Sequence, residues 1–164
     1  MEKKWRAVFV SLALFIFLFS YAYAAGSFGR QERTAINFSL QDLKGKTYTL
    51  TGYKDKHSVV LFFWTTWCPF CRQELKAIND LYPQLQKDGL EILAIDVEES
   101  ANTLERFLQR YALFIPVLLD RNAAVARDYD VMGVPTVFIV NKEGHIVFEG
   151  NHFPRQSYKT LLEE

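Results

Sequence analysis

The sequence has 164 residues, of which 49% are hydrophobic and 15% aromatic, and its formal net charge at pH 7 is zero. This composition excludes an intrinsically disordered chain and supplies enough apolar residues for one buried core. The balanced charge provides no strongly basic surface of the kind that binds nucleic acid, so we expect no nucleic-acid partner.

The first 25 residues have the pattern of an export signal. Three basic residues within positions 3–6 precede an almost wholly apolar run over 7–19, and an Ala-Tyr-Ala cleavage pattern ends at Ala24. The stretch 7–25 is also just long enough to span a bilayer as an uncleaved anchor with its basic end inside. We therefore expect residues 1–25 to be a signal peptide or an N-terminal membrane anchor, and the protein to be exported.

A linker and a small hairpin follow this segment. Residues 26–33 are small and polar, as in a linker, and the remaining residues 34–164 have the length of one domain. Apolar and polar residues alternate from Ile36 to Leu40, which predicts a half-buried strand. The Lys-Gly-Lys at 44–46 predicts a hairpin turn into a second short strand that ends near Leu50.

The chain has two cysteines, Cys68 and Cys71, and both follow a strongly apolar strand, Val59 to Phe63. Pro69 suits the first turn of a helix, and apolar residues recur at helical spacing from Leu75 to Leu85. Cys68 should therefore cap the helix N-terminus, where unpaired N–H groups and the helix dipole stabilise a thiolate. We expect Cys68 to be the attacking sulfur and Cys71, one turn later, to resolve the mixed disulfide.

Two other uses of the cysteine pair are less well supported. A C-x-x-C can supply half of a zinc site, but the remaining candidate ligands, His57, His145 and His152, are scattered singly along the chain. A purely structural disulfide is disfavoured because so short a loop removes little entropy from the unfolded chain. We therefore expect no metal, and no cofactor other than a redox-active Cys68–Cys71 disulfide.

The rest of the chain alternates strands and helices. Asn102 and Glu105 have the spacing of a capping box and begin a helix that should extend to Tyr111. The other predicted elements are a helix through Pro83 that ends at Asp88-Gly89, strands over 90–97 and 115–119, a helix over about 122–129, a strand pair at 136–140 and 145–149, and a short helix after Pro154. This order predicts an α/β fold with a mixed sheet and helices on both faces.

The motifs around the dithiol resemble those of the thioredoxin superfamily. Trp67-Cys68-Pro69-Phe70-Cys71 follows an apolar strand, and Gly133-Val134-Pro135-Thr136 lies well downstream. Residues 37–46 and 114–120 are similar to the membrane-associated TlpA/ResA/CcmG-like proteins, part of the redoxin or AhpC-TSA-like group. The resemblance covers roughly residues 34–150 and implies a thioredoxin-like mixed sheet flanked by helices, with an N-terminal β-hairpin and a helical insertion.

The resemblance also implies roles for residues beside the dithiol. Pro135 matches the cis-proline that lies against the active-site disulfide in this superfamily, and Val134 would offer its backbone to a substrate in extended conformation. Trp67, Pro69 and Phe70 would contribute to the surface that contacts the substrate. For Trp67, a place in the hydrophobic core is the alternative.

Glu74 is a further candidate for the active site. Thioredoxin has a buried aspartate six residues before its first cysteine, and Phe62 occupies that position here. Glu74, one turn beyond Cys71, matches a glutamate of the ResA-like group and would raise the thiol pKa values by repulsion and relay a proton to Cys71. The alternative is an ordinary solvated residue on the helix surface.

Together these features predict an exported thiol-disulfide oxidoreductase that acts on protein thiols and disulfides. The resemblance implies a reductant in cytochrome c maturation, with apocytochrome c as substrate, a membrane-embedded electron donor, and a location in the periplasm or on the outer face of a bacterial cytoplasmic membrane. An uncleaved N-terminal segment would attach the protein to that membrane.

Three alternative functions remain open. The first is a general disulfide reductase or oxidase of the cell envelope. The second is a thiol peroxidase, because Thr65 and Cys68 have the T-x-x-C spacing of peroxiredoxins, although Leu61 replaces their usual proline. The third is a copper-binding chaperone that uses His145 and His152 in addition to the cysteines.

Overall fold

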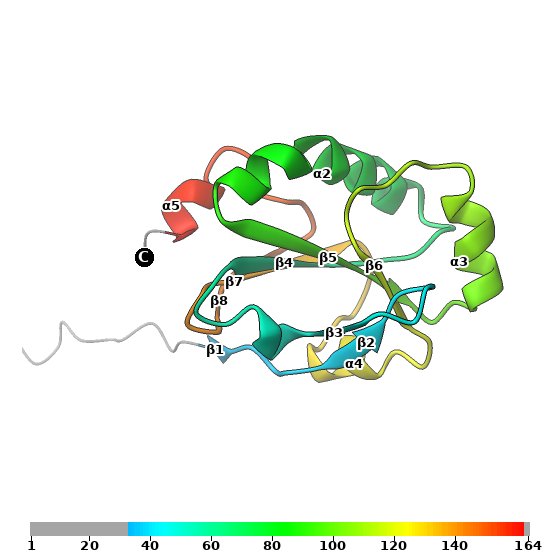
Figure 1. The fold of residues 1–164 in the computed structure, drawn as a ribbon, viewed down its shortest axis with the longest axis horizontal. Coiled ribbons are helices and arrows are strands. Elements are labelled where there is room, and N and C mark those ends of the chain that lie inside the picture. The colour runs from blue at the N-terminus through cyan, green and yellow to red at the C-terminus, as the bar shows by residue number, and fades with distance from the viewer. Residues whose placement is uncertain (1–32, 163–164) are drawn as a thin grey trace, which may run out of the picture. The chain divides into compact units, whose positions relative to one another are not determined.

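A central strand, buried along its whole length, organises the sheet. Strand β4, Ser58–Trp64, is buried at every residue, as its continuous apolar sequence predicts. It pairs in parallel with β5, Leu90–Val97, and antiparallel with β7, Thr136–Val140. In the computed structural model, which describes residues 33–162, these strands form the centre of an eight-stranded mixed sheet (Figure 1).

The sheet is extended by the strands on either side of this centre. On one side, β8, His145–Gly150, pairs with β7, and the short β1, Arg33–Thr34, forms the edge. On the other side, β6, Val117–Asp120, pairs in parallel with β5 and is followed by the predicted N-terminal hairpin. The hairpin strands are β2, Ser39–Gln41, and β3, Thr47–Thr49, and their turn contains Gly45 with a φ of +80°.

Helices cover both faces of the sheet, as predicted (Figure 1). The long helix α2, Pro69–Lys87, packs on one face, and side chains of α3, Ala101–Leu108, and α5, Tyr158–Leu162, join the same core. Helix α4, Ala124–Asp128, and the short 3₁₀ helix η1, Leu50–Gly52, contribute to the core on the other face. The expected thioredoxin-like architecture is therefore confirmed.

The side chains of β4 alternate between these two cores. Those of Val60, Phe62 and Trp64 lie in the core below α2, whereas the intervening residues face α4. Burying each of these large apolar side chains stabilises the fold by about 1.5–3 kcal/mol. The strand is therefore firmly held, and it brings the residues after Trp64 to the edge of the sheet at which α2 begins.

The predicted cap of α3 is wrong. Ser100, not Asn102, is the N-cap, and its hydroxyl accepts a hydrogen bond from the N–H of Thr103 at 3.2 Å. Ser100 keeps the extended backbone conformation that a cap requires, and Asn102 already lies inside the helix. The helix also ends at Leu108, three residues before the predicted end at Tyr111. The ends of β6 and α4 differ from their predictions by one or two residues.

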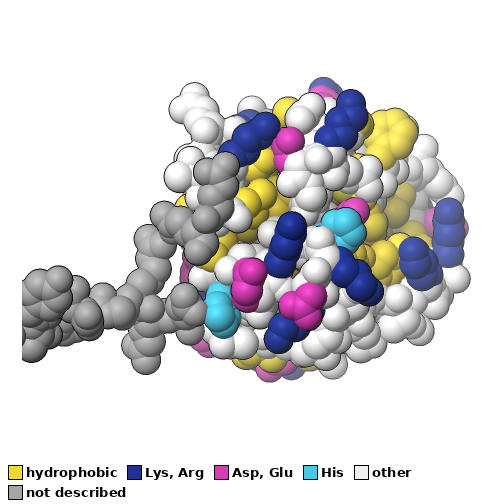
Figure 2. All heavy atoms as spheres, turned by 60° about the vertical axis from the view of Figure 1, so that its left-hand side comes forward, with side chains coloured by type: hydrophobic (Ala, Val, Ile, Leu, Met, Phe, Trp, Pro, Cys, Tyr) yellow, Lys and Arg dark blue, Asp and Glu magenta, His cyan; other side chains and the backbone are white. Residues whose placement is uncertain are grey.

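The predicted signal or anchor, residues 1–25, and the predicted linker as far as residue 32 lie outside the described residues. Within residues 33–162, no helix combines the length and the hydropathy needed to cross a membrane. Figure 2 shows basic and acidic side chains interspersed on one face of the molecule, in keeping with the zero formal net charge.

Candidate active site

The dithiol lies at the junction of β4 and α2, where the sequence predicts it. Cys68 is the N-cap residue of α2, and its sulfur accepts a hydrogen bond from the N–H of Cys71 at 3.2 Å. The two cysteines form a disulfide with their Cα atoms 5.2 Å apart, and Pro69 occupies the first helical position. In the reduced protein, this N–H and the helix dipole would stabilise a thiolate at Cys68.

Exposed apolar side chains lie next to the nearly buried cysteines in the sequence. Cys68 is 5% exposed and Cys71 is fully buried, whereas the neighbouring Trp67 and Phe70 are 69% and 70% exposed. The core alternative for Trp67 is therefore wrong. Met132, two residues before Val134, is 97% exposed. We call Trp67, Phe70 and Met132 the apolar rim, because they belong to the two segments that carry Cys68 and Val134, and large exposed apolar side chains are typical of a binding surface.

The peptide bond between Val134 and Pro135 is cis, as predicted, and the role of Pro135 in substrate binding stays a prediction. The carbonyl oxygen of Val134 lies 3.8 Å from the sulfur of Cys68. A disulfide sulfur carries no proton, so this contact becomes a possible hydrogen bond only when Cys68 is reduced to a thiol. The backbone before Pro135 therefore borders the sulfur that we expect to attack the substrate.

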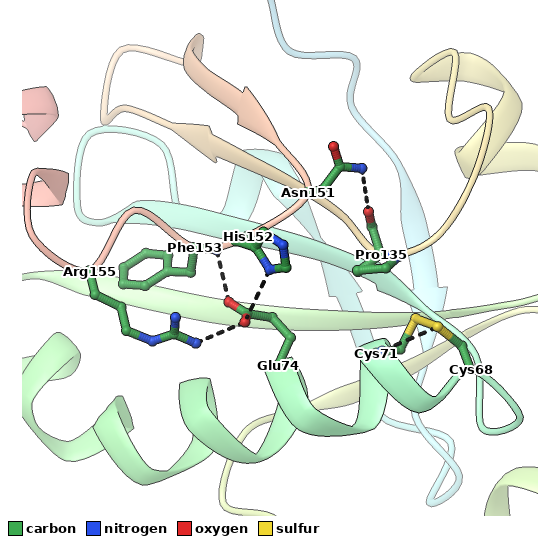
Figure 3. Close-up of polar contacts among 8 residues, drawn as sticks. All are labelled: Cys68, Cys71, Glu74, Pro135, Asn151, His152, Phe153 and Arg155. Atoms are coloured by element: carbon green, nitrogen blue, oxygen red, sulfur yellow. Dashed lines mark hydrogen bonds and ion pairs between the residues drawn. A yellow bond between two sulfur atoms is a disulfide. The ribbon is translucent and has the colours of Figure 1, made fainter.

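Glu74 is only 5% exposed, so its assignment as a solvated helix residue is wrong. One carboxylate oxygen accepts a hydrogen bond from the N–H of Phe153 at 2.8 Å, and the other accepts one from the guanidinium of Arg155 at 2.8 Å. The ring nitrogen Nδ1 of His152 lies 3.6 Å from the second oxygen. Figure 3 shows the carboxylate turned toward this segment and away from the sulfurs. The proton relay from Glu74 to Cys71 remains a prediction.

The segment Asn151–Arg155, between β8 and α5, also contacts the loop of the cis-proline. The side-chain amide of Asn151 donates a hydrogen bond to the carbonyl oxygen of Pro135 at 3.0 Å (Figure 3). One short segment therefore binds both the active-site helix and the cis-proline loop. No local motif in the sequence indicated these contacts, and the residues lie beyond the part of the chain that resembles the thioredoxin superfamily.

Two acidic residues, Glu99 and Asp96, are neighbours of the short segment that precedes Cys68. The carboxylate of Glu99 accepts hydrogen bonds from the N–H of Thr66 and, at 2.7 Å, from its hydroxyl. Asp96, opposite Trp64 in the sheet, is fully buried, and no N–H or O–H group of the described residues donates to its oxygens. Burial and, to a smaller extent, the neighbouring Glu99 raise the pKa of Asp96 to about 9. Asp96 is therefore protonated at neutral pH.

Residues 33–162 contain no group of three or more His, Cys, Asp or Glu side chains placed to hold a metal ion. Of the histidines considered for copper binding, His152 lies beside Glu74.

Comparisons with known proteins agree with this geometry. The AhpC/TSA family profile matches residues 32–149. The thiol-disulfide oxidoreductase ResA of Geobacillus thermodenitrificans is 42% identical over 113 residues, which are 69% of this chain and 64% of that relative. ResA of Bacillus cereus is 36% identical over 129 residues, covering 76% of this chain and 74% of the relative. A solved structure from Chlorobium tepidum, described as a thiol:disulfide interchange protein DsbE, superposes with a TM-score of 0.70 at 25% identity, covering 80% of this chain and 92% of the other. The chain therefore belongs to the AhpC/TSA family of thioredoxin-like proteins.

Proposed function

We propose that this protein is a thiol-disulfide oxidoreductase that exchanges the Cys68–Cys71 disulfide with cysteine pairs of other proteins. The observation that carries the proposal is the disulfide at the N-terminus of α2, bordered by the cis Val134–Pro135 peptide. Relatives that are named thiol-disulfide oxidoreductases support it.

In the reducing direction, the thiolate of Cys68 attacks one sulfur of a substrate disulfide. The substrate S–S bond breaks, its second sulfur leaves as a thiolate that takes up a proton, and a mixed disulfide forms at Cys68. The deprotonated Cys71 then attacks the sulfur of Cys68 and releases the first substrate sulfur. Two electrons and two protons pass to the substrate, and the protein is left with the Cys68–Cys71 disulfide.

The surroundings of Cys68 favour an extended substrate segment with apolar residues near its cysteines. The apolar rim offers exposed hydrophobic surface on the two segments that carry Cys68 and Val134, and the backbone of Val134 offers an edge for hydrogen bonding in extended conformation. A small disulfide without such residues would use neither feature. The rim therefore distinguishes protein substrates from small thiol compounds.

Replacing both Trp67 and Phe70 by alanine should lower the rate of exchange with a protein disulfide about tenfold, as expected for the loss of exposed aromatic contacts at a binding surface. Exchange with oxidised glutathione should stay close to the wild-type rate. The rates are measured by stopped-flow spectroscopy, which follows either tryptophan fluorescence or the absorbance of the thiol that is released. Phe114→Ala is the matched control, because this aromatic residue is equally exposed, at 73%, but lies between α3 and β6. Equal losses with both substrates would argue against a docking role for the rim.

We further propose that the protein is exported and reduces apocytochrome c, as its resemblance to ResA-like proteins and the pattern of residues 1–25 imply. A C-x-x-C-H haem site must be reduced before haem can attach to it. Because exported compartments are generally oxidising, a membrane-embedded donor would have to return electrons to Cys68 and Cys71.

Deletion of the gene tests this role. Covalently bound c-type cytochrome should fall in the deleted strain, and an externally added thiol should restore it. If cytochromes are unchanged while disulfides are missing from other envelope proteins, the protein is an oxidase and the proposed direction of electron flow is wrong.

A thiol peroxidase is the second candidate. Thr65, three residues before Cys68, is buried, and its hydroxyl has no hydrogen-bond partner among the described residues. Stopped-flow oxidation of the reduced protein separates the two activities. A dithiol exchanger should react with hydrogen peroxide no faster than a free thiol, whereas a peroxidase should react much faster with peroxide than with protein disulfides.

A further inference from the structure

Arg155 and Glu74 connect the segment after β8 to the active-site helix. The distance from Nη2 of Arg155 to the carboxylate of Glu74 is 2.8 Å, and the side chain of Glu74 is only 6% exposed. A buried carboxylate requires partners for its charge, and Glu74 finds them in Arg155 and in the N–H of Phe153. The orientation of Glu74 is therefore determined by residues 79 and 81 positions further along the chain.

The segment that carries Arg155 is itself well anchored. The side chain of Phe153 is buried in the core and packs on the ring of Tyr158 in α5, with 5.3 Å between ring centroids. The side-chain amide of Asn151 donates a hydrogen bond to the carbonyl oxygen of Pro135. Arg155 therefore projects from a fixed support, and Figure 3 shows its guanidinium on the side of Glu74 opposite to the disulfide.

Three other basic residues near α2 have partners other than Glu74. Lys76 pairs with Asp80 at 2.9 Å, and Lys159 pairs with Asp88 at 3.2 Å. Arg72 donates to the carbonyl oxygen of Thr66. Besides Arg155, the basic side chain that lies against Glu74 within residues 33–162 is that of the exposed His152, at 3.6 Å.

We propose that Arg155 is a positioning residue for the dithiol: it holds the carboxylate of Glu74 turned away from the sulfurs, and thereby keeps the proton affinity of the two thiols low. The inference rests on the proposed thiol-disulfide exchange. Glu74 lies three residues after Cys71, and side chains at this spacing are neighbours on one face of a helix. Released from Arg155, the carboxylate can turn toward the thiols, and a nearby negative charge disfavours the thiolate. Arg155 itself is 40% exposed, so solvent screens its direct effect on the sulfurs.

Four forms of the 164-residue chain test this inference: the wild type, Arg155→Met, Glu74→Gln and the double variant. Methionine keeps the apolar stem of the arginine and removes the guanidinium. The rate of Cys68 alkylation by iodoacetamide is measured from pH 4 to 10 on the reduced proteins. Arg155→Met should raise the pH at half-maximal rate by about one unit, which is about a tenfold lower rate on the acidic side. The same change in the Glu74→Gln background should have little effect.

The conservative variant and a control complete the design. Arg155→Lys can still reach Glu74 and should titrate close to the wild type. Lys159→Met removes a neighbouring cation that pairs with Asp88, and should leave the titration unchanged. If Arg155→Met fails to fold, Arg155→Ala and Arg155→Lys are compared in both backgrounds instead, with circular dichroism to establish folding.

Equal shifts with and without Glu74, or no shift in either background, would overturn the role of Arg155. The exchange of the wild-type protein with a disulfide-bonded peptide is measured on the same samples. If the wild type exchanges disulfides and the Glu74-dependent shift is absent, only this inference fails. If the wild type exchanges no disulfide, the proposed function fails, whatever the titration shows.

Discussion

Replacing Cys68 by serine should abolish disulfide exchange, with a rate at least about a thousandfold below that of the wild type. A serine hydroxyl does not ionise near neutral pH, so the helix N-terminus has no thiolate to stabilise, and the remaining Cys71 is buried away from a substrate. The rate is measured as the reduction of a disulfide-bonded protein by the reduced variant.

Cys71→Ser is the natural counterpart, because it leaves the attacking sulfur in place and removes the resolving one. It should form a covalent mixed disulfide with the substrate, detectable by mass spectrometry without reducing agent. Residual exchange in Cys68→Ser together with adducts attached to Cys71 would reverse the roles that we assign to the two sulfurs.

Asp96→Asn should stabilise the protein by up to about 4 kcal/mol at pH 7. The pKa of Asp96 is about 9 in the folded protein, against an ordinary value of 3.8. Folding at neutral pH therefore requires the uptake of a proton that the unfolded chain does not hold. An asparagine has the same shape and needs no proton, and its amide can donate a hydrogen bond to the neighbouring Glu99.

The dependence on pH follows from the same pKa shift. Between about pH 4 and pH 9, the folded protein holds one proton more at Asp96 than the unfolded chain, so the stability of the wild type should fall as pH rises through this window. Urea unfolding of the oxidised proteins at pH 5, 7 and 8 should show a difference between variant and wild type that grows with pH.

Asp120→Asn is the matched control for this experiment. Asp120 is also buried, on the neighbouring strand β6, but its carboxylate accepts a hydrogen bond from the N–H of Ala126 at 2.8 Å. We expect no stabilisation from this change. A difference between Asp96→Asn and the wild type that does not vary with pH would contradict the protonation of Asp96.

The dithiol and its immediate surroundings could be predicted because their signals are local. The apolar run before Trp64, the proline after Cys68 and the helical spacing beyond it define a strand, a cap and a helix within thirty residues. The cis conformation before Pro135 followed from a motif that resembles a known superfamily. These features depend little on the rest of the fold.

The contacts around Glu74 and Asp96 depend on the whole fold and could not be predicted in this way. The helical spacing predicts the position of Glu74 on the helix correctly, but its partner Arg155 is 81 residues away, in a segment without a recognisable motif. The burial of Asp96 results from its position on β5 beneath α2 and α3, in a strand whose other residues, apart from Glu91, are apolar. Neither the spacing of residues in the sequence nor their type indicates that Arg155 is the partner of Glu74 or that Asp96 is buried.

The most direct test of whether the protein is a thiol-disulfide oxidoreductase is to measure its disulfide exchange with one peptide from both directions. The peptide carries a Cys-x-x-Cys-His sequence flanked by apolar residues, and the mixtures are quenched with an alkylating agent and analysed by mass spectrometry. Reduced protein with oxidised peptide, and oxidised protein with reduced peptide, should reach the same equilibrium, with one Cys68–Cys71 disulfide gained or lost for each peptide disulfide. If the peptide and the protein keep their initial redox states in both mixtures, the protein is not a thiol-disulfide oxidoreductase for such substrates.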